Sequence, residues 1–288
     1  MLRTTHQLSS SDLNALKTLL NTCQEVDSAR IPVYSHLLKD GRSGPPSLLY
    51  YQQEQLVGFL ALFRFHANVA EIALLTHPSY RKQGLASQLW ESMCQNVQLL
   101  NLPLTHFIVS SPQGLNQTWS HQHAFHFENT EYNMTCPPYA PRISHQCIYT
   151  IKTADYHDID NLYTIDHACF NPNRPEPIQR IKKMLSTPNC KIFILFHKKQ
   201  IIGQVHLKIK DQKIWLTDFA ILPHMQQQGF GKILLIYCMK YAYKHHKKEI
   251  NLTVLAKNTS AVHLYQNIGF QIYNAIDYYK RRFSLDRF

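Results

Sequence analysis

The chain of 288 residues repeats itself, and this repeat limits its fold more than any other feature. Residues 56–58 (LVG) match residues 201–203 (IIG) at an offset of 145. The same offset relates three further pairs: Pro78 and Pro223, Gly84 and Gly229, and residues 124–125 (AF) and 269–270 (GF). Several anchors in one register, with no gap between them, indicate an internal duplication with two copies of one domain.

A Pro-rich stretch at residues 136–141 (CPPYAP) interrupts the chain between the two copies. Proline has no backbone N–H and restricts the residue before it, so this stretch is a poor helix or inner strand and a good linker. We therefore predict an N-terminal domain at 1–138, a linker at 139–146 and a C-terminal domain at 147–288.

Hydrophobic periodicity predicts the same elements in both copies. In the second copy we expect strands at 191–196, 205–209, 214–222, 252–255 and 270–273, with helices at 160–170, after residue 229 and around 261–265. The alternation at 205–209 predicts a half-buried strand with its polar residues in solvent. In the first copy we expect strands at 48–51, 56–65 and 69–76. Strands that alternate with helices predict a layered α/β fold, here a mixed, mostly antiparallel sheet flanked by helices.

Composition is typical of a globular chain, with 44% hydrophobic and 17% charged residues. No apolar run approaches the length of a membrane span, and residues 1–12 lack the apolar segment of a signal peptide. The seven cysteines form no CxxC pair, which favours free thiols in a reducing compartment. We expect a cytoplasmic protein without membrane contact.

Charge is distributed unevenly, because the whole formal net charge of +11 lies in residues 152–288. A basic half suits a polyanionic ligand or partner, such as a phosphate compound, nucleic acid or an acidic protein. A general contribution to solubility explains the charge equally well. Charge therefore leaves the choice of ligand open.

The segment with the most chemical information is the turn at 226–231 (QQQGFG), which follows a predicted strand and opens a predicted helix. Glycine allows positive φ and close approach of the backbone, and a helix N-terminus offers unpaired N–H groups to an anion. The turn lacks the GxGxxG spacing of dinucleotide folds and the GK[ST] ending of P-loops. It therefore predicts a cradle for a pyrophosphate, and residues 81–86 (RKQGLA) repeat it.

The flanking segments make the pattern specific. Residues 218–223 (DFAILP) precede the turn, and residues 258–270 (NTSAVHLYQNIGF) follow it. Together they resemble the Gcn5-related N-acetyltransferase (GNAT) superfamily, closely in the second copy and partly in the first. The first copy matches in the cradle and then departs, since Gln113, Ser120 and Ala124 stand where Asn258, Tyr265 and Gly269 stand in the second.

The resemblance implies two tandem GNAT domains and transfer of an acetyl group from acetyl-CoA to a primary amine by direct attack. It implies that Tyr265 protonates the departing sulfur, although the ring could instead only pack. Asp218 is the candidate general base or, alternatively, a carboxylate on the strand surface. Asn258 either contacts the cofactor or caps the next helix. The residues implied to bind the cofactor are Phe219, Ala220, Ile221, Gln226, Gln227, Gln228, Gly229, Phe230, Gly231, Lys232 and Asn258, with Arg81, Gly84 and Ala86 in the first copy.

Several alternatives stay open at this stage. The first copy either keeps CoA binding or serves as a structural partner in an internal pseudo-dimer. Glu71 is the sole carboxylate on the first copy's cradle strand, where solvation explains it most simply. His121, His123 and His126 are spaced for a metal, but no Cys or carboxylate cluster accompanies them, and we expect no metal. The rival function is a non-catalytic CoA-binding or nucleic-acid-binding module that uses the basic half; the acceptor is either a small molecule or a protein.

Overall fold

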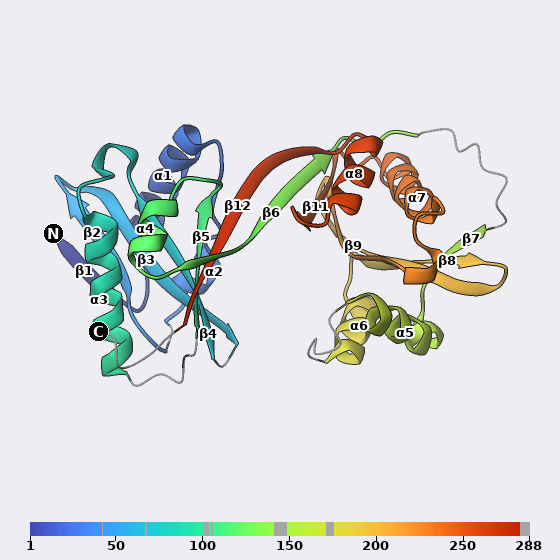
Figure 1. Cartoon of the computed structure of the whole chain (residues 1–288), viewed down its shortest axis with the longest axis horizontal. Helices are drawn as coiled ribbons and strands as arrows, with labels where there is room; N and C mark the ends of the chain where they lie inside the picture. The colour runs from blue at the N-terminus through green and yellow to red at the C-terminus, as the bar shows by residue number, and fades with distance from the viewer. Residues whose placement is uncertain are drawn as a thin grey trace. The chain divides into compact units, whose positions relative to one another are not determined.

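The computed structural model describes residues 1–41, 43–66, 68–100, 104, 106–140, 149–170 and 176–282. These residues form two compact units (Figure 1). Unit 1 contains the described residues of Met1–Tyr132, Leu255–Lys257 and Asn274–Phe288, and unit 2 contains those of Asn133–Val254 and Asn258–Tyr273. Each unit therefore takes segments from both halves of the sequence.

The first repeat forms six strands and four α-helices within the described residues. In chain order they are β1 (Leu2–Thr5), α1 (Ser10–Asp27), α2 (Ser35–Lys39), β2 (Ser47–Gln52), β3 (Gln55–His66), β4 (Val69–Thr76), the short 3-10 helix η1 (Pro78–Tyr80), α3 (Leu85–Leu99), β5 (His106–Pro112), α4 (Gln117–Gln122) and β6 (His126–Cys136). A capping box between Ser9 and Asp12 fixes the start of α1. The predicted strands and cradle helix of this copy are confirmed.

The second repeat follows the same order. Its elements are β7 (Tyr149–Thr153), η2 (Tyr156–Asp158), α5 (Ile159–Cys169), α6 (Pro177–Ser186), β8 (Cys190–His197), β9 (Gln200–Lys210), β10 (Lys213–Ile221), η3 (Pro223–Met225), α7 (Phe230–Lys244), β11 (Glu249–Leu255), α8 (Thr259–Ile268) and β12 (Gln271–Arg282). The mixed α/β architecture is as predicted. The last strand is much longer than the expected 270–273.

The length of β12 has a structural reason, because this strand completes the sheet of unit 1. It pairs antiparallel with β5, from Ile276 opposite Pro112 to Arg282 opposite His106. In return, β6 of the first repeat lies beside β11, where Thr253 Oγ1 donates to Asn133 Oδ1 at 2.9 Å. The compact units are thus a different division from the repeat boundaries at 1–138, 139–146 and 147–288, which stay a prediction about the duplicated sequence. Residues 141–146 of that linker lie outside the described residues.

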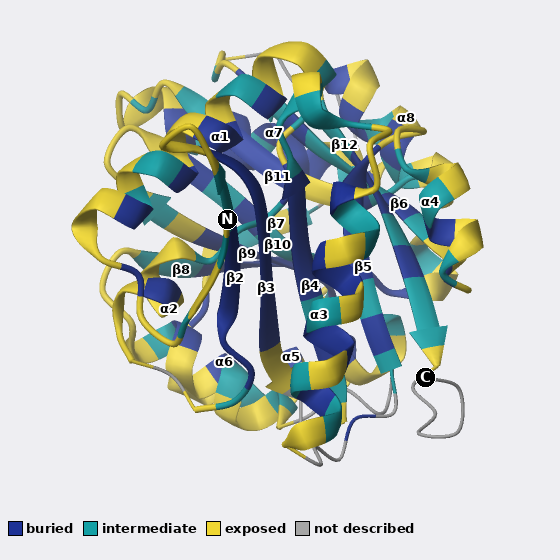
Figure 2. Cartoon of the chain, turned by 90° about the vertical axis from the view of Figure 1, so that its left-hand side faces the viewer, coloured by how far each residue is buried: buried dark blue, intermediate teal, exposed yellow. Residues whose placement is uncertain are grey.

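Unit 1 has one apolar core on each face of its sheet. Alternate residues of β3 and β4 point to opposite faces, so that Leu60 and Leu74 pack with α3 while Phe59 and Ala73 pack with α1. Figure 2 shows the result, with β2, β3 and β4 largely dark blue beside the partly exposed α3. The sheet that carries the first cradle is therefore covered on both faces.

Unit 2 also covers its sheet on both faces, and this corrects the prediction for β9. The residues expected to be buried, such as Val205 and Leu207, are buried, but the alternate residues Gln204 and His206 are buried as well, at 0% and 4% exposure. Ile192 and Ile194, their partners on β8, pack against α5 and α6. The alternation therefore reflects two covered faces rather than one solvated face.

Two further observations concern the predicted surroundings of the chain. No helix among the described residues is long and apolar enough to cross a membrane. The six cysteines within the described residues are all free thiols.

Candidate active site

The two glycine turns have the same backbone conformation. Gly84 caps α3 with φ +83°, and Gly229 caps α7 with φ +86°. Two residues earlier, Lys82 and Gln227 also have positive φ, at +58° and +59°. A Cβ built on Gly84 or Gly229 meets no atom within 4 Å, so the backbone here faces open space. The repeated sequence thus builds one turn twice.

The first side chain of each turn holds the turn to the preceding strand. Arg81 Nε donates to the carbonyl of Thr76 at 3.2 Å, and Gln226 Nε2 donates to the carbonyl of Ile221 at 2.9 Å. In each repeat a cysteine thiol contacts the same carbonyl at 3.5 Å, Cys23 in the first and Cys169 in the second.

The side chains of Arg81 and Gln226, predicted to bind a cofactor, are therefore occupied in shaping the cradle. Arg81 is held further by two hydrogen bonds to Asp27, at 2.6 and 2.7 Å. The carbonyl of Ile221 already accepts from Gln226 and Cys169. This end of β10 therefore has fewer backbone groups that could pair with a cofactor.

What each turn offers to a ligand is its backbone. The first N–H groups of α3 and α7 have no partner within their own helix, and they carry the positive end of the helix dipole. The side chains of Ala220, Ile221 and Phe230 are buried in the core, so these predicted residues have only their backbone to offer. Both turns fit a phosphate or diphosphate group.

Gly231 has a different role from the one that its place in the turn suggested. A Cβ on Gly231 would lie 3.2 Å from Leu264 Cδ2 and 3.8 Å from the Phe219 ring. Its missing side chain therefore allows α8 and β10 to pack against α7. In the first repeat, Ala86 stands at the position equivalent to Gly231, and Trp119 stands at the position equivalent to Leu264.

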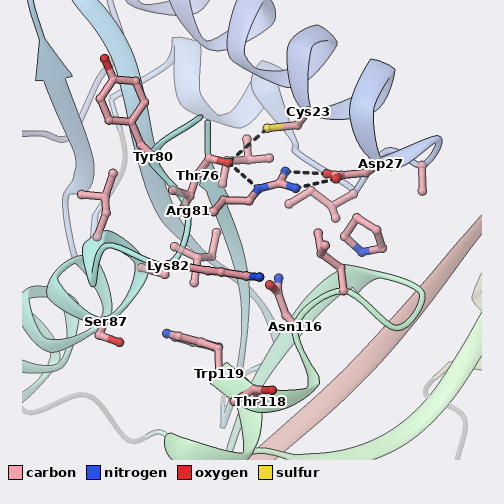
Figure 3. A pocket seen from close by; sticks show the side chains of 18 of the residues that line it. Cys23, Asp27, Thr76, Tyr80, Arg81, Lys82, Ser87, Asn116, Thr118 and Trp119 are labelled. Carbon is pink, nitrogen blue, oxygen red and sulfur yellow. Dashed lines mark hydrogen bonds and ion pairs between the residues drawn. The ribbon is translucent and has the colours of Figure 1, made fainter. Parts of the chain in front are cut away.

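The first turn opens into a cavity of 390 Å³. Its walls come from α1, the end of β4, the turn, the start of α3 and the segment from Pro112 to Gln122. Figure 3 shows Arg81 against Asp27 on the α1 side, with Lys82 extending toward Asn116 and Trp119 on the wall built by α4. This cavity lies within unit 1 and belongs to the first repeat, in which the sequence pattern around the turn is less complete than in the second.

In both repeats the strand before the turn separates from its parallel neighbour. The pairing of β4 with β5 ends at Ile72 and Val109, and that of β10 with β11 ends at Leu216 and Leu252. In the second repeat β10 also changes register against β9 between Thr217 and Ala220. Such a bulge leaves backbone groups outside the ladder and re-aims a side chain.

The side chain re-aimed by this bulge is Asp218. Its φ is +47°, its side chain is 15% exposed, and its Oδ2 lies 3.3 Å from Nδ1 of His206 on β9. Sequence reasoning singled out Asp218 and missed His206, because a polar residue in an alternating strand is ordinarily solvated. The offset of 145 gives the missing signal, since Ala61 and Ala73 fill the two equivalent places in the first repeat.

Tyr265 lies in α8 with 7% exposure. Its ring meets Phe219 edge-on at 6.0 Å and Phe270 at 5.8 Å between centroids. Burial raises the pKa of its hydroxyl, so the phenol keeps its proton at neutral pH. Ser120 takes this place in the first repeat and is also buried.

Asn258 caps α8, since its Oδ1 accepts from the backbone N–H of Ala261 at 3.2 Å. Of the two roles considered for this residue, the cap is thus observed, and contact with a cofactor stays a prediction. Gln228 Nε2 donates to the carbonyl of His224 at 3.1 Å, just as Gln83 Nε2 donates to that of Ser79. Gln227 lies within the turn, and Lys232 lies in the first turn of α7.

The sequence suggested that Glu71 is solvated, but its carboxylate accepts a hydrogen bond from another side chain. Tyr34 Oη donates to Glu71 Oε2 at 2.9 Å, and Glu131 on β6 interacts with Tyr278 on β12. Burial raises the pKa of Glu131, the hydrogen bond from Tyr278 lowers it, and the nearby charge of Glu71 raises it. A small recess beside β4 includes Glu71 and Tyr278.

The histidines at 121, 123 and 126 belong to three different local structures. His121 lies in the last turn of α4, His126 begins β6, and His123 Nε2 lies 2.8 Å from Ser87 Oγ. Among the residues whose structure is described, no group of three or more His, Cys, Asp or Glu side chains is placed to hold a metal.

Comparison with known proteins identifies a family. The profile described as "Acetyltransferase (GNAT) family" matches residues 13–104 and again residues 158–270, once in each repeat. A "Probable spermine N(1)-acetyltransferase" of Bacillus subtilis subsp. natto is 34% identical over 70 residues, which are 24% of this chain and 46% of that protein. Acetyltransferase PseH of Campylobacter jejuni is 29% identical over 100 residues, which are 34% of this chain and 62% of that protein. The matches thus span between 46% and 62% of these relatives.

Solved structures match over nearly the whole chain. A GCN5-related N-acetyltransferase from Sphaerobacter thermophilus has a TM-score of 0.78 at 16% identity, over 98% of this chain and 95% of its own. A tandem GNAT protein from the clavulanic acid biosynthesis pathway has a TM-score of 0.67 at 12% identity, over 98% of both chains. At such identities the likeness shows the fold, including its tandem arrangement.

Proposed function

The chain belongs to the acetyltransferase (GNAT) family, and from this premise we propose that its second repeat transfers an acetyl group from acetyl-CoA to a primary amine. The transfer proceeds by direct attack in a ternary complex. The observation that carries the proposal is the grouping of three features along one strand: the Gly229 turn, the bulge that presents Asp218, and Tyr265 against Phe219.

The Gly229 turn supplies the cofactor site. Backbone N–H groups from the turn and from the start of α7 bind the diphosphate, supported by the helix dipole. Acetyl-CoA, when bound, supplies a thioester whose acyl carbon accepts the amine. Lys232 in the first turn of α7 adds a positive charge near the phosphates.

Asp218 and His206 handle the proton of the amine. The carboxylate of Asp218 accepts this proton, and His206, 3.3 Å away, holds the carboxylate in place. Burial of His206 at 4% exposure fixes its ring. Residues of this kind in an otherwise apolar layer are expensive for stability, which supports a chemical role.

Tyr265 completes the exchange by donating its proton to the departing sulfur. Its raised pKa keeps the donor protonated at neutral pH, and its ring lies against Phe219 beside the bulge. Replacing Tyr265 with Phe therefore removes the proton donor and keeps the ring.

The acceptor is best identified by a screen that measures release of the free CoA thiol. Spermine deserves inclusion, because the Bacillus relatives are named for it, together with diamines and peptides with free N-termini or lysines. Turnover with at least one amine, lost on Gly229→Val, supports the proposal. Tight acetyl-CoA binding without turnover on any acceptor contradicts it. We also propose a reducing, cytoplasmic location, which the free cysteines support.

A non-catalytic, polyanion-binding role is the second candidate. The hairpin between β9 and β10 meets the segment that follows α7, where Lys247 Nζ donates to the carbonyl of Asp211 at 2.8 Å. This contact gathers basic residues from both segments, namely Lys210, Lys213, Lys244, Lys247 and Lys248. A steep fall of nucleic-acid affinity with salt supports this role, and absence of binding at low salt rejects it.

A further inference from the structure

The cavity of the first repeat passes through the sheet. Pairing between β4 and β5 ends at Ile72 and Val109, and beyond this point both Leu74 and Leu75 line the cavity. Leu74 belongs to the core on the α3 side, whereas Leu75 belongs to the core on the α1 side. A ligand that enters at the turn can therefore extend through the gap between the two strands toward α1.

The two ends of this cavity differ in chemistry. At the turn the wall contains Lys82, Asn116 and the N-terminal groups of α3, which suit an anionic group. At the α1 end the wall consists of Leu20, Ala29, Ile31 and Leu75, and the three large side chains are between 4% and 6% exposed.

Charge at the apolar end is largely neutralised. Asp27 is held in a double hydrogen bond by Arg81, and Arg30 is exposed at the rim. Two residues before Leu75 on β4, and on the neighbouring β3, the first repeat carries Ala73 and Ala61 where the second carries Asp218 and His206. The two alanines do not line the cavity, and the strands beside it thus lack the His–Asp pair that would take a proton from an amine in the second repeat.

We propose that the first repeat binds an acyl-CoA whose acyl chain is longer than acetyl, with the chain in the apolar end formed by Leu20, Ala29, Ile31 and Leu75. An anionic head and an apolar tail match the two ends of one cavity of 390 Å³. The inference rests on the proposed role of the glycine turn as a diphosphate cradle, and it is independent of turnover in the second repeat.

The expected dependence on chain length follows from the hydrophobic effect. Burial of one methylene contributes about 0.8 kcal/mol, which is about fourfold in Kd. Butyryl-CoA carries two methylenes more than acetyl-CoA and therefore should bind about 15-fold more tightly.

Calorimetric titration with CoA, acetyl-CoA, butyryl-CoA and hexanoyl-CoA tests the proposal. Gly229→Val confines binding to the first repeat, and the reciprocal variant Gly84→Val should remove the chain-length dependence. Ala29→Phe fills the apolar end, so it should abolish the gain from acetyl to butyryl while CoA itself binds as before. Ala29→Ser, which leaves the space open, is the matched control.

The outcomes separate this inference from the proposed function. Equal or weaker binding of butyryl-CoA than acetyl-CoA to the Gly229→Val protein overturns the acyl site, even where the second repeat turns over acetyl-CoA. Absence of any CoA binding to that protein overturns it too. A chain-length gain that survives Ala29→Phe places the chain elsewhere and rejects the assigned wall. Absence of acetyl transfer by the unmodified protein would contradict the proposed function and leave the acyl site untouched.

Discussion

The two repeats build the same turn and surround it with different chemistry. Gly84 and Gly229 share a left-handed conformation, and the side chains of Arg81 and Gln226 pin their turns to equivalent carbonyls. Behind the turn, however, the first repeat packs Phe59, Ala61 and Ala73 where the second carries Gln204, His206 and Asp218. The backbone that cradles an anion is therefore separable from the groups that would perform a reaction.

This difference is informative because the apolar version shows what the fold alone requires. Buried polar groups destabilise a protein unless hydrogen bonds compensate them, and the first repeat closes the same layer without them. We therefore expect the polar residues of the second repeat not to be needed for folding. Four substitutions, each with a control, test the comparison between the two repeats, beginning with the largest expected effect.

Loss of the second turn should have the largest effect. Gly229→Val places a β-branched residue at φ +86° and fills the space in front of the backbone, so we expect acetyl-CoA binding at this repeat and all turnover to disappear. The matched variant Gly84→Val should leave most of the acetyl transfer. Calorimetry and thiol release measure both, with circular dichroism as the folding control. A larger loss from Gly84→Val would reverse the assignment of the catalytic repeat.

Removal of the Tyr265 hydroxyl should have the next largest effect. General acid catalysis typically contributes about 10²–10⁴-fold, or roughly 3–5 kcal/mol of barrier, so Tyr265→Phe should lower kcat within that range. Affinity for acetyl-CoA should hardly change, because the ring and its contact with Phe219 remain. Single-turnover kinetics measure the step itself, and a fall of less than about threefold would show that the ring only packs.

Replacement of Gln204 with Leu should make the protein more stable, unlike the preceding substitutions, which remove function. Its side chain is fully buried, and neither amide atom has a hydrogen-bond partner among the described residues. An unsatisfied buried polar group costs about 1–3 kcal/mol, so Gln204→Leu should raise the unfolding free energy of unit 2 by about 1 kcal/mol. Phe59→Gln is the mirror change and should destabilise unit 1. Urea unfolding measures both, and a destabilised Gln204→Leu protein would mean that the amide is needed for the fold.

Parts of this arrangement were predictable from sequence, and the reason is local. The turn depends on glycine at one position and on the helix that follows, so the sequences of residues 81–86 and 226–231 predict it directly. Tyr265 and Asp218 were identified by their place in a longer pattern, and their catalytic roles stay predictions. The open space at Gly229 and the packing role of Gly231 could not be predicted, because they depend on neighbours distant in sequence.

Other parts depend on contacts that no local pattern reports. The pairing of β12 with β5 joins residues more than one repeat apart, so a short final strand was predicted where a long one exists. The burial of His206 depends on α5 and α6 covering the second face of β9, whereas an alternating pattern assumes that one face is solvated. Comparison of equivalent positions in the two repeats would have pointed to His206, since a change from alanine to a polar residue is visible in sequence.

The smallest expected effect tests whether unit 1 also bears a stability cost for polarity. Burial raises the pKa of Glu131, the hydrogen bond from Tyr278 lowers it, and Glu71 raises it, with a net upward shift from 4.5. The folded protein therefore binds this proton more tightly than the unfolded chain does. The resulting stabilisation is complete below about pH 4.5 and is lost as the pH rises through the folded pKa.

Glu131→Gln removes that titration and keeps an acceptor for Tyr278. We expect the variant to be more stable than the parent at pH 7 and equally stable at pH 4. Glu128→Gln is the matched control on the same strand, because Glu128 is exposed and lies 3.8 Å from Lys280. Thermal unfolding across this pH range measures the difference. If both variants respond alike, Glu131 carries no stability cost of its own, and the contrast between an apolar first repeat and a polar second one extends over the whole of unit 1. If only Glu131→Gln gains stability, buried polarity has a cost in unit 1 as well, and the contrast is confined to Phe59, Ala61 and Ala73.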